Sequence, residues 1–124
     1  MIEVTCAIII KNSEILAVQR GAESSHPFLW EFPGGKIHAE ETADQCIVRE
    51  IKEELSVEIE VLSRLTAVDF DYGVKQIRLI PFVCQVVTGE IELTEHISKC
   101  WFSLDEWQSI SWSGADYELI VENQ

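Results

Sequence analysis

The segment from Thr42 to Leu55 constrains the fold more than any other part of the sequence, because it predicts one amphipathic helix. Ile47, Ile51 and Leu55 recur every four residues, which places their side chains on one helical face. Thr42 is a favourable N-cap residue, and Gln45 follows three residues later, where it completes a capping box. A helix with one apolar stripe must bury that stripe against another layer, so the rest of the chain has to supply one.

The sequence on both sides of this helix predicts mostly strands, because runs of β-branched and aromatic residues alternate with turn signals. The expected strands span residues 3–10, 14–19, 57–72, 74–89 and 98–104, and a short extended piece at 29–32 is ended by Pro33-Gly34-Gly35. A short helix at 104–109, capped by Ser103 and Glu106, and a terminal helix at 114–123 complete the order. This order predicts an α+β fold over residues 1–124 as a single domain, with a mixed β-sheet flanked by helices in an α/β/α sandwich.

The formal net charge of -13 argues against binding to a nucleic-acid polymer, which requires a basic surface. A small phosphate ligand remains compatible, because divalent cations would offset the acid crowding and bridge to phosphate oxygens. No apolar run is long enough to span a membrane, and the N-terminal "MIEVTCAIII" predicts a strand rather than a signal peptide. The four cysteines lack the close spacing of a zinc site, which indicates reduced thiols in a cytoplasmic protein.

Three glutamates of the predicted helix, Glu50, Glu53 and Glu54, occupy positions i, i+3 and i+4 and therefore share one face. No lysine four residues away relieves their repulsion, and grouped carboxylates are the ligands that Mg²⁺ or Mn²⁺ prefers. The alternative is a solvated acidic face, which is the usual meaning of a charge run. Arg49 can orient one carboxylate, and the bare backbone of Gly34-Gly35 can approach a metal or a phosphate, so both features favour a metal site.

The segment from Gly35 to Val57 resembles the Nudix box, the motif of hydrolases that act on nucleoside diphosphates linked to another group. That motif is G, five residues, E, seven residues, then R-E-U-x-E-E-x-G-U, where U is aliphatic. Matching residues stand at eight positions: Gly35, Glu41, Arg49, Glu50, Ile51, Glu53, Glu54 and Val57. Ser56 replaces the glycine that supplies a left-handed turn at the helix end, and we expect about 1 kcal/mol of strain there. The flanking "LWEFPGGKI" and "EH...WFSLDE" resemble the MutT-like branch, which hydrolyses nucleoside triphosphates.

The resemblance implies a Nudix-type sandwich and a metal-dependent reaction. The positions that match family metal ligands are the Gly34 carbonyl, Glu50, Glu53, Glu54 and, in a later loop, Glu95. Glu50, Glu53, Arg49 and Glu95 are the expected catalytic residues, with Arg49 orienting a metal-binding glutamate. Glu41 is expected to support the site or to reach the metal through water, whereas Glu95 is either a ligand, a general base or an ordinary loop acid. The implied cofactor is Mg²⁺, or alternatively Mn²⁺, and the implied reaction converts a nucleoside triphosphate and water to a monophosphate and pyrophosphate.

The expected substrate-binding residues are Arg20, Gly35, Lys75 and Asp116. Arg20 resembles a MutT-like residue that contacts the nucleotide, although a surface arginine after a strand is the alternative. Lys75 and Asp116 match positions that contact the base, and Asp116 is otherwise an acid in the first turn of a helix. An ionised Asp116 would offer only acceptors, which suits the exocyclic amine of cytosine or adenine. Three aromatic residues are candidates for stacking on a base but are more often core residues: Phe28, Trp30 and Phe82.

Two substrate classes therefore follow for a small-molecule nucleotide hydrolase. One is an oxidised purine triphosphate such as 8-oxo-dGTP, and the other is CTP or a modified pyrimidine triphosphate. Two further hypotheses come from other classes of protein: a Nudix module that binds a nucleotide without hydrolysis, and an acidic interaction domain. The intact glutamates argue against the first of these, because a sensor has no need of them.

Overall fold

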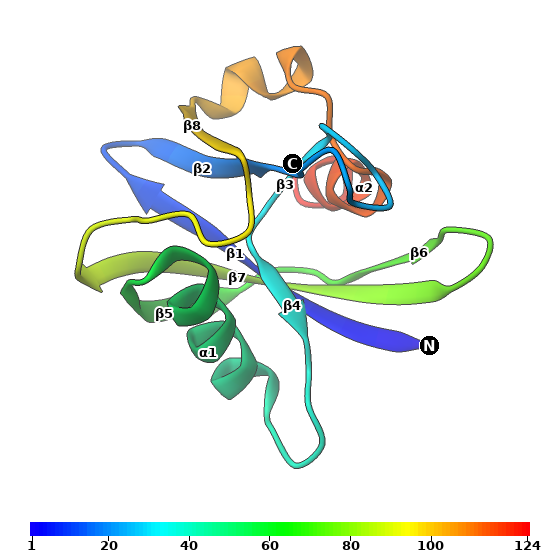
Figure 1. The fold of residues 1–124 in the computed structure, drawn as a ribbon, viewed down its shortest axis with the longest axis horizontal. Helices are drawn as coiled ribbons and strands as arrows, with labels where there is room; N and C mark the ends of the chain where they lie inside the picture. Colours follow the sequence, from blue (N-terminus) through cyan, green and yellow to red (C-terminus); the bar gives the residue numbers. More distant parts are fainter.

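Two long strands, β1 (Ile2–Lys11) and β7 (Gln76–Thr88), form the parallel pair at the centre of a mixed sheet (Figure 1). This architecture is seen in a computed structural model that describes all residues from 1 to 124. The pairing runs from Ile2 opposite Ile77 to Ile9 opposite Cys84. The sheet order is β3-β2-β1-β7-β5, with β4 also paired to β1, β6 to β7 and β8 to β2. The remaining strands are β2 (Glu14–Gln19), β3 (Trp30–Glu31), β4 (Gly34–Lys36), β5 (Glu58–Arg64), β6 (Val68–Asp71) and β8 (Ser98–Phe102).

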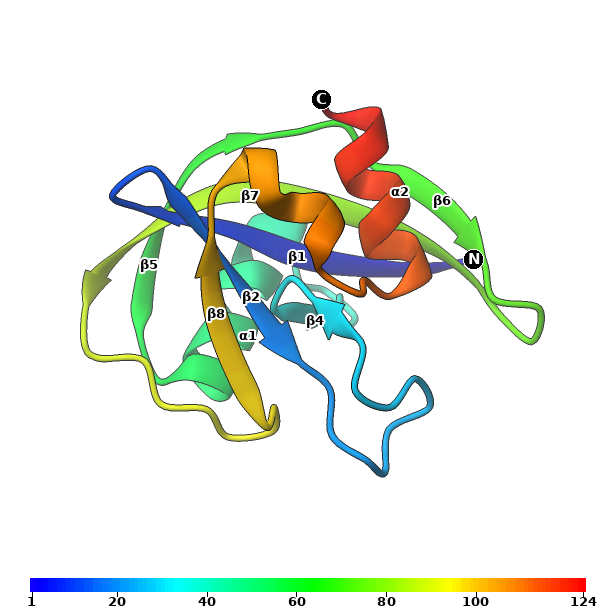
Figure 2. The same cartoon turned by 90° about the horizontal axis from the view of Figure 1, so that it is seen from above.

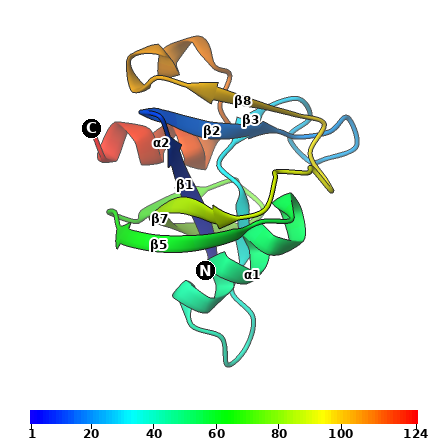
Figure 3. The ribbon, with the colours of Figure 1, turned by 90° about the vertical axis from the view of Figure 1, so that its left-hand side faces the viewer.

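Helices cover both faces of the central strands. Helix α1 (Ala43–Leu55) lies on one side, while α2 (Gly114–Glu122) and the 3₁₀-helix η1 (Leu104–Ser109) lie on the other (Figures 1 and 3). Figure 2 shows η1 and α2 packed over the strands, with α1 behind them. This arrangement confirms the predicted α+β sandwich with a mixed sheet. No helix combines the length and the apolar character needed to cross a membrane.

The alternation of β1 side chains divides the core into two layers. Cys6 and Ile8 pack in the cluster that contains residues of α2, whereas Ala7 and Ile9 pack in the cluster that contains the apolar stripe of α1. Successive side chains of a strand point to opposite faces of a sheet, so one buried strand serves both layers. The cysteines at positions 6, 46 and 84 are buried as free thiols.

Helix α1 begins as predicted. The backbone N–H of Gln45 donates to Thr42 Oγ1 at 3.1 Å, and the N–H of Thr42 donates to Gln45 Oε1 at 3.0 Å. Ile47, Ile51 and Leu55 are fully buried against the sheet. Capping and the apolar stripe together fix the start and the rotation of this helix.

Two strand predictions were wrong in their boundaries. Residues 57–72 form two strands, β5 and β6, which pair with successive parts of β7. Pro33-Gly34-Gly35 was expected to end an extended piece, but Gly34 instead begins β4, which pairs with β1. A Cβ atom at Gly34 would collide with the backbone oxygen of Thr5, so glycine permits this close pairing.

Ser56 ends α1 in the left-handed conformation, with φ 61° and ψ 30°, as predicted for this position. Its N–H donates to the Lys52 carbonyl at 3.0 Å. We expect Ser56→Gly to raise the free energy of unfolding by about 0.5–1 kcal/mol, because glycine adopts this conformation without strain. Urea unfolding measures this change, and Ser63→Gly in the exposed part of β5 is the control, where glycine should lower stability. A loss of stability in Ser56→Gly would contradict the prediction.

Candidate active site

A hollow of about 350 Å³ lies beside the C-terminal half of α1 and has no apolar residue in its wall. We call it the acidic hollow. It gathers predicted residues from four parts of the chain: Arg20 after β2, Gly34 and Gly35 of β4, Glu50 and Glu54 of α1, and Glu95 of the loop before β8. Six of the positions predicted from sequence therefore face one space.

Glu54 is the most deeply placed acid of the acidic hollow, with 5% of its surface exposed. The Gly34 N–H donates to its Oε1 at 3.3 Å. Burial, followed by the negative charges of Glu50 and Glu95, raises the pKa of Glu54 to about 9. Carboxyl groups this close cannot all ionise without a compensating cation, and a divalent metal ion would supply that charge. The acidic hollow therefore offers oxygen ligands of the kind that the predicted metal prefers.

Arg49 holds three glutamates in fixed orientations. Its Nε donates to Glu41 Oε2 at 2.6 Å, and its Nη1 donates to Glu50 Oε1 at 2.8 Å and to Glu53 Oε1 at 2.9 Å. The bonds from Arg49, together with the His38 N–H, lower the pKa of Glu41 to about 2. Glu41 thus contacts the arginine rather than the acidic hollow, and Arg49 is placed to orient Glu50 and Glu53.

Glu53 differs from the other predicted ligands in its position. Its side chain is 56% exposed, is paired with Arg49, and does not line the acidic hollow. No three acidic, histidine or cysteine side chains converge closely enough to ligate one ion in this arrangement. A metal ion at Glu53 would have to compete with Arg49 for the carboxylate.

Gly35 has a specific steric reason to be glycine. A Cβ atom at this position would collide with the carboxylate of Glu50. Its carbonyl accepts a hydrogen bond from Thr5 Oγ1 at 3.1 Å, which fixes β4 to β1. The absence of a side chain at Gly35 thus leaves room for the Glu50 carboxylate.

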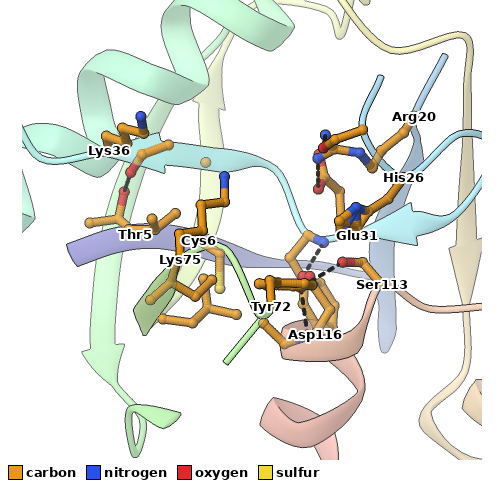
Figure 4. Close-up of a pocket in the computed structure, with 18 residues that line it drawn as sticks. Thr5, Cys6, Arg20, His26, Glu31, Lys36, Tyr72, Lys75, Ser113 and Asp116 are labelled. Carbon is orange, nitrogen blue, oxygen red and sulfur yellow. Dashed lines mark hydrogen bonds and ion pairs between the residues drawn. The ribbon is translucent and has the colours of Figure 1, made fainter. Parts of the chain in front are cut away.

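A second space of about 210 Å³, the inner hollow, adjoins the acidic hollow and shares Arg20, Glu31, Gly34 and Gly35 with it. Figure 4 shows Arg20 and Glu31 on one side of the inner hollow, Thr5 and Lys36 on the other, and Asp116 below. Lys75 enters from the turn between β6 and β7 (Figure 4). The structure therefore places Arg20, Gly35, Lys75 and Asp116 around one space.

Asp116 is buried in the first turn of α2, and its Oδ1 accepts a hydrogen bond from the Phe32 N–H at 2.9 Å. Burial, and secondly the charge of Glu31, raises the pKa of Asp116 well above its usual range. A raised pKa favours the protonated carboxyl, whereas the acceptor-only interpretation of Asp116 applies to its ionised form. Because Oδ1 accepts from Phe32, Oδ2 is the oxygen from which a protonated carboxyl would donate.

The three aromatic residues that were candidates for stacking on a base do not line the inner hollow. Phe82 is buried in the core against α1, and neither Phe28 nor Trp30 lines the inner hollow. Tyr72 and His26 lie there instead, in an edge-on contact with ring centroids 4.8 Å apart. Tyr72 lies at the end of β6, and its hydroxyl accepts from the Ala115 N–H at 2.9 Å, which fixes its ring against the start of α2.

Sequence reasoning missed Glu31 and His96, which both line the acidic hollow. Glu31 Oε1 accepts from Arg20 Nη1 at 2.8 Å, and its Oε2 lies 2.8 Å from His96 Nε2. These bonds, which outweigh the burial of Glu31, lower its pKa. A charged residue inside the apolar "LWEF" and a histidine directly after Glu95 were the available signals.

The fold and the two adjoining hollows are compatible with a hydrolase that acts on a small nucleotide, and comparison with known proteins shows the family. Residues 1–121 match the family profile described as NUDIX domain, so the chain belongs to the Nudix family. It is a Nudix hydrolase, and enzymes of this family generally use divalent metal ions.

Its relatives include the CTP pyrophosphohydrolase of Escherichia coli K12, which is 34% identical over 120 residues, covering 97% of this chain and 89% of that protein. The 8-oxo-dGTP diphosphatase of Proteus vulgaris is 33% identical over 90 residues, covering 73% of this chain and 79% of that protein. Among solved structures, the E. coli ORF135 protein superposes with a TM-score of 0.84 at 34% identity, covering 98% of this chain and 86% of that one. The MutT protein of Methanosarcina mazei Go1 shares the fold, with a TM-score of 0.87 at 24% identity over 98% of this chain and 91% of that one.

Proposed function

We propose that this protein is a MutT-like nucleoside triphosphate pyrophosphohydrolase that removes oxidised or non-standard nucleotides such as 8-oxo-dGTP. The observation that carries the proposal is the shared wall of the two hollows, formed by Arg20, Glu31, Gly34 and Gly35. A triphosphate chain in the acidic hollow would thereby continue into a nucleoside in the inner hollow. Relatives named 8-oxo-dGTP diphosphatase support this substrate class.

The proposed metal is Mg²⁺, with Mn²⁺ as the alternative, held by the Gly34 carbonyl, Glu50, Glu54 and Glu95, whose side chains would have to draw together around the ion. Glu53, which lies outside the acidic hollow, would join them only by giving up its bond to Arg49. When bound, it would neutralise phosphate charge and activate water. Arg49 orients Glu50 and Glu53 for this role. Arg20 would face the phosphates. Glu95, whose side chain has no hydrogen-bond partner in the protein, would join the metal ligands, and its alternative role is to remove a proton from the attacking water.

CTP or a modified pyrimidine triphosphate is the second candidate substrate. The relative named CTP pyrophosphohydrolase aligns with 97% of the chain, which favours this candidate. A protonated Asp116, which its raised pKa favours, would also fit it, because N3 of cytosine is an acceptor that the Oδ2–H group could meet. The O6 atom of 8-oxoguanine is an acceptor as well, so the carboxyl is compatible with both bases.

A substrate panel tests the proposal and separates the two candidates. We would measure release of pyrophosphate and of nucleoside monophosphate from the four dNTPs, 8-oxo-dGTP, CTP and 5-substituted dCTP, with Mg²⁺, with Mn²⁺ and with EDTA. The expected result is pyrophosphate release that needs a divalent metal, with the highest kcat/KM for 8-oxo-dGTP. A highest kcat/KM for CTP would favour the second candidate, and no pyrophosphate from any triphosphate would refute both.

A further inference from the structure

Glu95 lies in the loop between β7 and β8 and faces the acidic hollow, yet its own side chain makes no hydrogen bond to the protein. Glu54 lines the same hollow, and the charge of Glu95 contributes to the raised pKa of Glu54. A carboxylate that repels its neighbours and has no bond of its own would turn away from them in a free loop. The position of Glu95 must therefore be set by the residues on either side of it.

Thr94 attaches the loop to the end of helix α1. Its backbone N–H donates to the Glu54 carbonyl at 3.1 Å, and its Oγ1 donates to the Glu53 carbonyl at 2.8 Å. Glu92 adds a third bond, from its N–H to the Leu55 carbonyl at 2.9 Å. The last carbonyl groups of a helix have no hydrogen-bond donor within the helix, so this loop supplies donors for them. It does so on the helical turn that carries Glu53 and Glu54.

His96 attaches the other side of the loop. Its side chain is only 6% exposed, and its Nε2 lies 2.8 Å from Glu31 Oε2. The opposite oxygen of Glu31 accepts from Arg20 at 2.8 Å, so the carboxylate bonds both residues at once. The Ile97 N–H adds a backbone bond to the Gln19 carbonyl at 3.0 Å. The loop is thus fixed to β2 and β3 as well as to α1.

We propose that Thr94 and His96 are positioning residues that hold Glu95 over the acidic hollow. The inference rests on the proposed function, because it assigns Glu95 to the metal site rather than to an ordinary loop surface. Thr94 fixes Glu95 relative to Glu54, whereas His96 fixes it relative to Arg20 through Glu31. Supporting groups of this kind reduce the conformational freedom that a ligand must otherwise lose on binding.

The test for Thr94 is its replacement by valine, which keeps the shape and the backbone N–H but removes the hydroxyl. We expect Mn²⁺ affinity, measured by electron paramagnetic resonance without nucleotide, to fall about tenfold. Thr94→Ser should restore most of it. Thr88→Val is the matched control, because Thr88 is also exposed and its hydroxyl makes no hydrogen bond. Unchanged Mn²⁺ affinity in a folded Thr94→Val variant would overturn the role of Thr94.

A double-mutant cycle asks whether Thr94 acts through Glu95. In a Glu95→Gln background we expect Thr94→Val to change Mn²⁺ affinity less than about twofold, since the group that it positions is already altered. A full tenfold loss in that background would show that Thr94 acts elsewhere and would overturn the inference. Because the measurement needs no turnover, the result stands apart from the proposed function, which fails separately if the wild type releases no pyrophosphate.

The test for His96 is His96→Phe, which keeps a buried ring but removes the bond to Glu31. We expect KM for the nucleotide to rise about tenfold, because Arg20 loses its fixed partner, and Mn²⁺ affinity to fall as well. His96→Gln, which can donate to Glu31, should recover part of both. A loss of thermal stability without any change in KM or Mn²⁺ affinity would reduce His96 to a structural residue and contradict the inference.

Discussion

Replacing Glu54 by glutamine is expected to lower kcat about a thousandfold while it raises the stability of the metal-free protein. The loss of activity follows because the amide removes the most buried carboxylate of the acidic hollow, which the proposed metal needs. The Gly34 N–H bond to Oε1 can persist, since the amide oxygen also accepts. Pyrophosphate release under saturating 8-oxo-dGTP or CTP measures kcat.

The gain in stability should depend on pH. Folding raises the pKa of Glu54 from 4.5 to about 9, so between these values the unfolded chain binds fewer protons than the folded one. The contribution of Glu54 to the free energy of unfolding of the wild type is therefore fully present below about pH 4.5, and it is lost as the pH rises toward 9. Glutamine does not titrate, so it removes this dependence of stability on pH. We expect the free energy of unfolding of Glu54→Gln to exceed that of the wild type by about 1–3 kcal/mol near pH 8.

Urea unfolding in EDTA at several pH values measures this difference. Glu118→Gln is the control, because Glu118 is exposed on the opposite helix and should change neither kcat nor the pH slope. Near-wild-type turnover in Glu54→Gln would refute the assignment of Glu54 to the metal site. Equal stability of the variant and the wild type at all pH values would refute the buried, protonated state of Glu54.

Replacing Asp116 by leucine is expected to lower kcat/KM about a hundredfold, whereas Asp116→Asn should stay within about threefold of the wild type. The raised pKa of Asp116 favours a protonated carboxyl, and the contrast follows because that form offers one acceptor and one donor, as an amide does. Leucine has a similar shape but removes both groups and leaves the Phe32 N–H without its partner.

The measurement for Asp116 is kcat/KM with 8-oxo-dGTP and with CTP for both variants. The exposed Asp105 of η1 provides the control, since Asp105→Leu should leave both values unchanged. If Asp116 binds as an ionised acceptor instead, Asp116→Asn will shift preference away from cytosine toward 8-oxoguanine. Such a shift would contradict the protonated state.

The sequence predicts those parts of the fold whose pattern is local. Helix α1 was predictable because Thr42, Gln45 and the stripe at 47, 51 and 55 lie within one continuous segment. β4 was not, because three residues containing Gly34 and Gly35 become a strand only through pairing with β1, about thirty residues away. The break between β5 and β6 could not be predicted either, because it depends on how the two strands pair with successive parts of β7.

The same distinction applies to the candidate site. The spacing from Glu41 to Glu54 falls on one loop and one helix, so the arrangement around Arg49 could be inferred from sequence. The bond between His96 and Glu31 joins residues 65 positions apart, and no spacing rule encodes it. The raised pKa of Asp116 comes from burial and from the charge of Glu31, which are properties of the assembled fold.

The wall that the two hollows share also bears on how substrate preference can be altered. Arg20 and Glu31 face both spaces, and Glu31 is bonded to the loop that carries Glu95. A substitution at Glu31 would disturb both recognition of the nucleotide and the hydrolysis reaction. Selection for activity on a new base should therefore rarely retain a substitution at Glu31. Changes at Tyr72 or Lys75, which line only the inner hollow, leave the acidic hollow untouched. Mutant libraries confined to such positions should therefore change which nucleotides the enzyme accepts without lowering kcat.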